Sequence, residues 1–140
     1  MADTQTAAPD SDRSRLIAIV VWGLYLAAVI NGITALAGVV LAYVSRGEAR
    51  GTVYESHFSH AIETFWISLL GLVILIVIAI VVFASGFSNL HDISTSSHVD
   101  FNASHLLLLP VLGLGGLALF VWYLYRSVTG LVRAIDAKPY

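Results

Sequence analysis

The sequence predicts an all-α integral membrane protein: a helical bundle with one short helical hairpin and two full transmembrane helices. Hydrophobic residues make up 58% of the chain and charged residues only 11%, and the mean hydropathy is +0.85. A soluble domain has roughly a quarter charged residues, so this chain lacks the polar groups that would cover its surface in water. Three long stretches also contain no Asp, Glu, Lys or Arg. The lipid bilayer is therefore the expected surrounding of this protein.

The beginning of the chain differs in composition from everything that follows. Residues 1–14 are small, polar and of mixed charge, and they predict a disordered cytoplasmic tail. The remainder, residues 15–140, has the length of a single membrane domain.

The first uncharged stretch, Leu16–Val44, is long for one crossing of a hydrocarbon core about 30 Å thick and short for two. It contains Asn31 followed by Gly32, a pair that favours a turn. The stretch is then either one tilted helix with Asn31 at its middle, or a hairpin of two short helices, about 16–30 and 33–44. Only the hairpin puts all seven Lys and Arg residues on one side of the membrane. Because basic residues near membrane segments stay in the cytoplasm, the hairpin is favoured.

The other two uncharged stretches, Thr64–Ala84 and Leu106–Tyr125, each have the length of one crossing. Residues 45–63, which precede the first of them, predict a cytoplasmic linker that contains an amphipathic helix. Residues 85–105 are rich in Ser and Asn and contain no Lys or Arg. They predict a solvated external loop, although their His and Asp side chains could bind a metal if the loop folded around it.

Small residues recur along the predicted hairpin with the spacing of a helix face. In lipid, small side chains allow helix backbones to approach each other closely. We therefore expect helix packing through this face, and a homo-oligomer or a larger membrane complex as the assembly. The residues are Gly23, Ala27, Ala28, Gly32, Ala35 and Gly38.

The linker contains the ionisable residues that lie nearest to the apolar stretches. If it is helical, His57 and His60 share a face and Glu63 lies one turn further. Two imidazoles and a carboxylate could bind a metal or pass protons, and Asn31 is another polar group within apolar sequence. The alternative is a membrane-surface helix whose His, Glu and Ser side chains face headgroups and water. The spacing matches no known zinc motif, so we expect no metal and no cofactor.

Other chemistry is poorly supported by the sequence. It contains no Gly-rich phosphate loop, no nucleophile elbow and no cysteine. It also contains no Lys/Arg cluster of the kind that binds nucleic acid. We expect a protein that is not an enzyme and that serves as a structural or accessory component of a membrane complex. The alternative is a small transporter or channel whose route is lined by His57, His60, Glu63 and Asn31.

Four parts of the chain carry distinctive motifs: AYVSRGEA at 42–49, SHF at 56–58, TFW at 64–66, and the ending WYLYRSVTGLVRAIDAKPY. Together they resemble a family of small bacterial membrane proteins of unknown function. That family is similar to a component of the chloroplast inner-envelope protein-import translocon. The resemblance implies a four-helix domain in a bacterial inner membrane, with both termini cytoplasmic. The residues that match are Arg46, Ser56, His57, Phe58, Thr64, Phe65, Trp66, Arg126, Gly130, Pro139 and Tyr140, whereas Ala61 and Glu63 depart from the Gln and Arg that the family commonly has.

Overall fold

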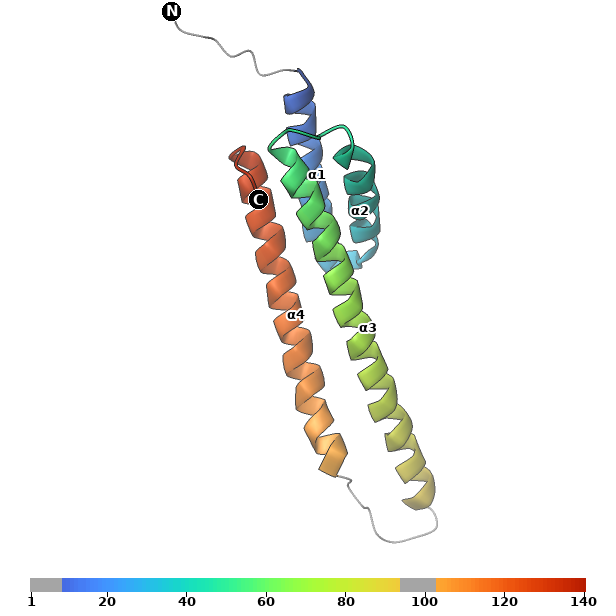
Figure 1. Ribbon diagram of the computed structural model, residues 1–140. Coiled ribbons are helices and arrows are strands. Elements are labelled where there is room, and N and C mark those ends of the chain that lie inside the picture. The colour runs from blue at the N-terminus through green and yellow to red at the C-terminus, as the bar shows by residue number, and fades with distance from the viewer. Residues whose placement is uncertain (1–8, 94–102) are drawn as a thin grey trace, which may run out of the picture. The chain divides into compact units, whose positions relative to one another are not determined.

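The described part of the protein is mostly helical. The computed structural model describes the backbone of residues 9–93 and 103–140, and the side chains of residues 12–84 and 108–140. No strand occurs among these residues, so the all-α prediction is confirmed. Figure 1 shows the four helices, which are α1 (Pro9–Asn31), α2 (Ile33–Arg46), α3 (Tyr54–Ile93) and α4 (Ala103–Ile135).

The chain forms two compact units. The first unit contains the residues up to Ile67 together with Tyr123–Tyr140, and therefore includes α1, α2, the start of α3 and the end of α4. The second unit is Ser68–Trp122, which contains the remaining parts of α3 and α4. All seven Lys and Arg residues belong to the first unit.

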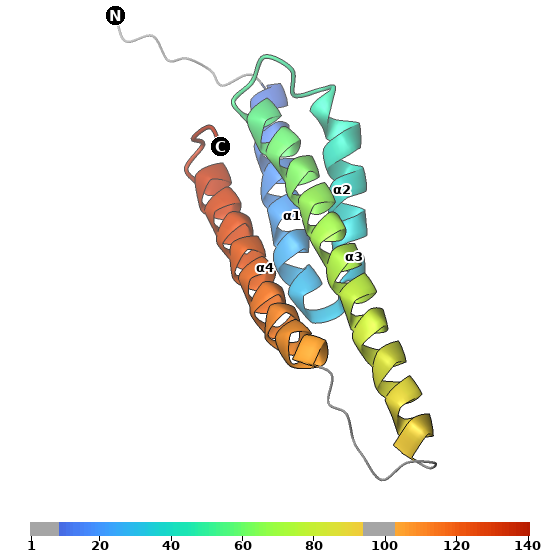
Figure 2. The same ribbon diagram turned by 60° about the horizontal axis from the view of Figure 1, so that its bottom comes forward.

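Helices α1 and α2 form the hairpin that the sequence predicts, and they lie side by side in Figures 1 and 2. The turn is made by Gly32, whose φ of 69° is the left-handed conformation that glycine adopts without steric cost. The Asn31 side chain caps α2, because its Oδ1 accepts hydrogen bonds from the amide and the hydroxyl of Thr34, each at 3.2 Å. Gly38 makes room for the Tyr25 ring, since a Cβ there would lie 2.7 Å from a ring carbon. A single tilted helix is therefore the wrong interpretation.

Among the residues that the structure describes, three helices are long and apolar enough to cross a membrane. The apolar segments are Asp12–Asn31, Tyr54–Ala84 and Leu108–Ile135, whereas α2 is shorter. The two predicted crossings, Thr64–Ala84 and Leu106–Tyr125, thus lie within helices that extend beyond them at both ends.

The beginning of the chain differs from the prediction of a disordered tail over residues 1–14. Helix α1 begins at Pro9, so residues 9–14 are helical, and residues 1–8 lie outside the described residues. Proline is well tolerated in the first turn of a helix, because the amide hydrogen that it lacks has no partner there.

The predicted loop over residues 85–105 is helical at both of its ends. Helix α3 continues to Ile93 and α4 begins at Ala103, which leaves residues 94–102 outside the described residues. The polar composition of this segment suggested a loop. However, each residue added to an existing helix forms one more backbone hydrogen bond, so a helix can continue through Ser and Asn residues. The side chains of the His and Asp residues in this segment lie outside the described residues, so the possible metal site there stays a prediction.

Residues 47–53 join α2 to α3 through a capped turn, and residues 54–63 of the predicted linker form the start of α3. The Thr52 hydroxyl accepts a hydrogen bond from the Tyr54 amide at 3.3 Å. The Glu55 carboxylate accepts one from the Gly51 amide at 3.0 Å. This Thr-x-x-Glu arrangement satisfies amides that have no partner within the helix.

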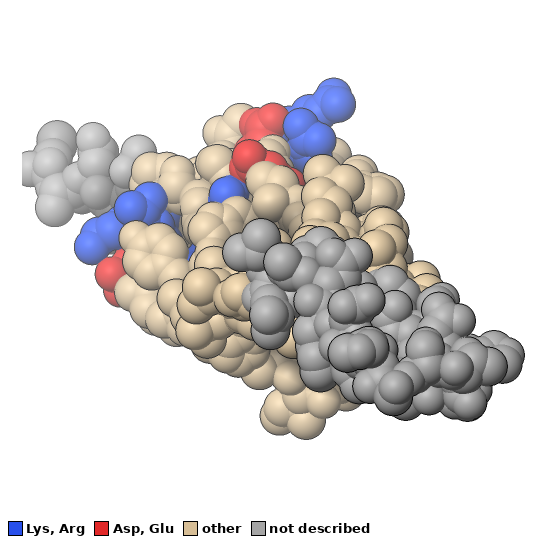
Figure 3. Space-filling model, turned by 90° about the horizontal axis from the view of Figure 1, so that it is seen from below, with Lys and Arg blue, Asp and Glu red and all other residues tan. Residues whose placement is uncertain are grey.

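The second unit is almost entirely apolar. Within its described side chains, residues 68–84 and 108–122, the one hydroxyl-bearing or charged residue is Ser68. Side chains of one helix lie over glycines of the other: a Cβ on Gly71 would lie 2.9 Å from Leu119, and a Cβ on Gly115 would lie 3.3 Å from Leu75. In the view of Figure 3, uncharged residues cover most of the described surface. Such a surface suits contact with lipid.

Candidate functional site

The last residues of the chain turn back beside α4. We call residues 136–140 the C-terminal segment. The Lys138 amide donates to the Arg133 carbonyl at 3.0 Å, and the Ala137 amide donates to the Ala134 carbonyl at 3.4 Å. These two bonds, with Ala137 in the left-handed conformation at φ 53°, form a Schellman motif, which ends a helix and reverses the chain.

Backbone groups of the C-terminal segment bind to the start of α3. The Tyr140 amide donates to the Ser56 hydroxyl at 3.1 Å, and His57 Nε2 lies 2.7 Å from the Lys138 carbonyl oxygen. On the other side of the imidazole, Trp22 Nε1 donates to His57 Nδ1 at 3.3 Å. A neutral imidazole with its proton on Nε2 satisfies both contacts. His57 thus links α1, α3 and the C-terminal segment.

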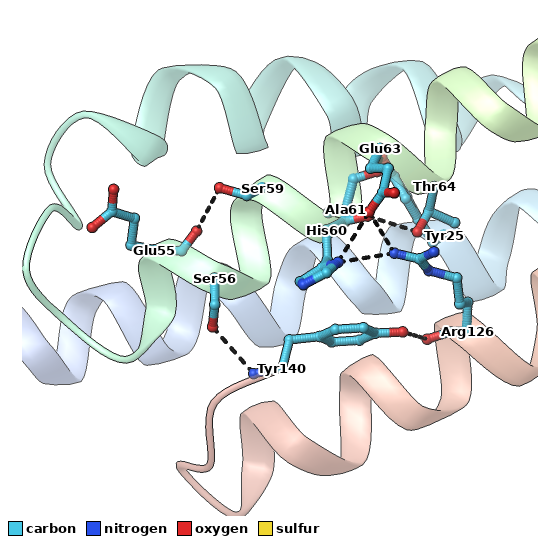
Figure 4. Close-up of polar contacts among 10 residues, drawn as sticks. All are labelled: Tyr25, Glu55, Ser56, Ser59, His60, Ala61, Glu63, Thr64, Arg126 and Tyr140. Atoms are coloured by element: carbon cyan, nitrogen blue, oxygen red, sulfur yellow. Dashed lines mark hydrogen bonds and ion pairs between the residues drawn. The ribbon is translucent and has the colours of Figure 1, made fainter.

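The Tyr140 ring lies among side chains from three helices, as Figure 4 shows in part. Its centroid is 5.4 Å from that of Trp22, with nearly parallel planes, and 4.5 Å from that of His60. The Arg126 and Arg133 guanidinium groups each lie 5.6 Å from the ring centroid. Burial raises the pKa of the Tyr140 phenol. The phenol therefore stays protonated near neutral pH and can donate to the Arg126 carbonyl, 3.4 Å away.

Arg126 also joins the two ionisable residues of the linker (Figure 4). One of its nitrogens lies 2.9 Å from Glu63 Oε2 and 3.0 Å from His60 Nδ1. The same His60 nitrogen is 3.1 Å from Glu63 Oε2, but it cannot accept from Arg126 and donate to Glu63 at once. In the arrangement that uses both Arg126 bonds, His60 Nδ1 is the acceptor. Arg126 thus binds the two side chains, His60 and Glu63, that are candidate metal ligands in the sequence.

The predicted metal or proton set is only partly assembled. Of its four residues, the structure brings His60 and Glu63 into contact. His57 is completely buried and bonded on both ring nitrogens, so the expectation that it faces headgroups and water is wrong. Asn31 caps α2 at the hairpin turn. No group of three or more His, Asp or Glu residues suited to a metal occurs in the described part of the chain.

The predicted packing residues have different roles within the hairpin. Gly38 is buried against Tyr25, and Gly32 makes the turn. Gly23, in contrast, has nothing within 4 Å of where a Cβ would lie. Its small size is therefore not required by packing against the described residues of this chain. Ala27, Ala28 and Ala35 are half-buried.

Sequence reasoning missed Trp22 and Tyr25, which are completely buried. The Tyr25 hydroxyl donates to the Ala61 carbonyl at 2.7 Å, and the Tyr123 hydroxyl donates to the Tyr25 carbonyl at 2.8 Å. One signal was available: a Trp and a Tyr three residues apart in an otherwise aliphatic helix. Buried Trp and Tyr need polar partners, which points to a neighbouring helix on that side.

Several motif residues contact the C-terminal segment. Ser56 and His57 bind its backbone, and the Arg126 guanidinium lies over the Tyr140 ring. Phe58 and Thr64 are buried, and Gly130 faces the Trp22 indole so closely that a Cβ would meet the ring. Comparison of the chain with models of protein families, with curated proteins and with solved structures found no match. The family resemblance therefore stays a prediction. Of the remaining motif residues, Arg46 lies at the end of α2 and Pro139 lies in the C-terminal segment. Phe65 is half-buried on α3. Trp66 is exposed on α3, and its ring nitrogen donates to the Tyr43 hydroxyl.

Proposed function

We propose that the protein is a non-enzymatic membrane protein that serves as a structural or accessory component of a larger membrane complex. One observation carries this proposal: the polar side chains of the linker bind other parts of the same chain. His57 links Trp22 to the Lys138 carbonyl, and Glu63 pairs with Arg126. Groups that are bonded in this way stabilise the fold and are poorly placed to act on a substrate.

The apolar second unit argues against the alternative of a transporter or channel. A route for protons or ions requires polar groups or water along its length. Among the described side chains of this unit, Ser68 is the one that carries a hydroxyl or a charge. A structural role needs no such groups.

The outer face of α1 supports association with another helix. Leu16, Val20 and Ile30 are exposed, and Gly23 and Ala27 lie between them at helical spacing on the same face. Large residues at the ends and small residues in the middle give a face on which a second helix can pack closely in lipid. The partner is a second copy of this chain or another subunit.

We further propose a bacterial inner membrane, with both termini cytoplasmic. All seven Lys and Arg residues belong to the first unit. Basic residues near membrane segments favour the cytoplasmic side. The resemblance to a translocon-like family points to the same membrane and orientation.

The association is tested by Gly23→Leu, with native mass spectrometry of the detergent-solubilised protein as the measurement. Gly23 has open space around it within the chain, so the variant should keep the thermal stability of the wild type but lose the larger assembly. Gly38→Leu is the matched control. Its side chain would collide with Tyr25, so it should lower the unfolding temperature instead. A wild-type monomer, or an assembly that survives Gly23→Leu, would contradict the proposal.

A further inference from the structure

An open groove lies between the last turns of α4 and the C-terminal segment. Its volume is about 640 Å³. One end is formed by Val128, Thr129 and Val132, and it is mainly apolar, with the two valines 48% and 50% exposed. The other end carries the charged side chains of Arg133, Asp136 and Lys138. The groove therefore changes from apolar to charged along the direction of α4.

The charged end suits an anion. Arg133 donates to the Pro139 carbonyl at 3.4 Å, and this bond fixes its direction while other N–H groups of the guanidinium stay available. Lys138 is paired with Asp136 at 3.2 Å on the exposed surface, where such a pair contributes little. Two cations and one carboxylate give the groove a net charge of +1, which matches a single phosphodiester.

The position of the groove suits an amphiphile. It lies at the C-terminal end of the apolar segment Leu108–Ile135, and the ends of such segments are where lipid headgroups meet protein. A phosphate bound by Arg133 and Lys138 would put the first carbons of an acyl chain beside Val128 and Val132. Basic pockets of this kind on membrane proteins bind phospholipid headgroups.

We propose that this groove binds the phosphodiester of a glycerophospholipid, with Arg133 and Lys138 as the phosphate ligands and the two valines as the acyl-chain wall. The same phosphate chemistry could come from a soluble phosphate. The inference goes beyond the proposed function, because it needs the membrane but not an accessory role.

The experiment is a titration of the purified, delipidated chain in detergent with phosphatidylglycerol, followed by native mass spectrometry. Lys138→Gln should weaken binding about tenfold, as expected for the loss of a charge-assisted phosphate contact. The Lys138→Gln variant should keep the fold, because the Lys138 side chain is exposed. The contact with His57 is made by the backbone carbonyl of residue 138, which the substitution does not change. Arg50→Gln is the matched control: it removes another exposed cation, which lies outside the groove, and should bind lipid like the wild type.

Two further arms identify the source of the phosphate. Val132→Ser should weaken the binding of phosphatidylglycerol, because it removes part of the acyl-chain wall, and inorganic phosphate alone should bind far more weakly than the lipid. Equal affinity of wild type and Lys138→Gln for the lipid would overturn the site. Inorganic phosphate that binds as tightly as the lipid, unaffected by Val132→Ser, would overturn the assignment to a phospholipid.

Discussion

The Tyr140 ring contacts residues from three helices that are distant in sequence. It stacks on Trp22 of α1, touches His60 of α3 and lies beside Arg126 of α4. These contacts join residues that are far apart in the sequence, and no local sequence pattern predicts them. Tyr140 was therefore noticed only because it belongs to one of the motifs. Contacts of this kind hold the C-terminal segment against the rest of the first unit.

Removal of the Tyr140 ring should destabilise the first unit. Tyr140→Ala loses aromatic contacts and part of the buried area of a large side chain, so we expect the free energy of unfolding to fall by about 1–3 kcal/mol. Tyr140→Phe keeps the ring and loses only a long hydrogen bond, so it should cost less than about 1 kcal/mol. Chemical unfolding in detergent measures both. If the two variants unfold alike, the ring does not hold the segment.

Gly130 should tolerate no side chain, because a Cβ there would meet the Trp22 indole. Gly130→Ala is expected to lower the free energy of unfolding by about 1–3 kcal/mol through overpacking. Gly113→Ala lies on the same helix with nothing within 4 Å of its Cβ position. It should be neutral or stabilising, because alanine favours a helix more than glycine does. Thermal unfolding distinguishes them, and equal behaviour would refute the close contact.

At the scale of elements, the hairpin was predictable and the helix ends were not. The pair Asn31 and Gly32 marked the turn, and the distribution of Lys and Arg decided between one helix and two. The first signal is a pair of neighbouring residues and the second is a count of charges, so both can be obtained from the sequence without knowing how the helices pack. The starts and ends of α3 and α4 depend on hydrogen bonds that continue through polar residues, which composition does not report.

The candidate site was predictable only in part, for the same reason. The spacing of His60 and Glu63 correctly indicated that these side chains meet. Their partner Arg126 lies on α4, and the contacts of His57 come from α1 and the C-terminal segment. Only the packing of the helices brings these groups together.

The end of α4 contains a conformation that its residue does not favour. Ala137 has a φ of 53°, and a non-glycine residue in this region costs about 1–2 kcal/mol. Ala137→Gly should therefore raise the free energy of unfolding by about 1 kcal/mol. Ala134→Gly, within the helix and buried, should lower it by at least about 1 kcal/mol. Thermal unfolding gives the signs, and destabilisation by both variants would contradict the Schellman motif.

At the scale of the whole molecule, the basic residues are unevenly divided between the two units. The first unit contains every Lys and Arg, and the described part of the second is almost free of polar side chains. Because basic residues near membrane segments favour the cytoplasmic side, this division is the basis of the proposed orientation.

Cysteine labelling in intact cells tests that orientation, since the chain contains no cysteine of its own. Single cysteines at Ser11, Glu48 and Ser97 report the two ends of the hairpin and the segment between α3 and α4. Glu48 is exposed, whereas the neighbouring Ser45 is buried and would react poorly. We expect an impermeant reagent to label position 97 alone. Labelling of positions 11 and 97 without position 48 would place the two ends of the hairpin on opposite sides.

The most direct test of the structural role is proton flux into liposomes that contain the purified chain, measured with a trapped pH-sensitive dye under an imposed gradient. Because His57, His60 and Glu63 are bonded within the fold, vesicles with the wild type should take up protons no faster than protein-free vesicles. Glu63→Gln should leave this flux unchanged and lower only the thermal stability, by less than about 1 kcal/mol for an exposed pair. Flux well above that of protein-free vesicles, lost in a folded Glu63→Gln variant, would contradict the account and establish a conduit.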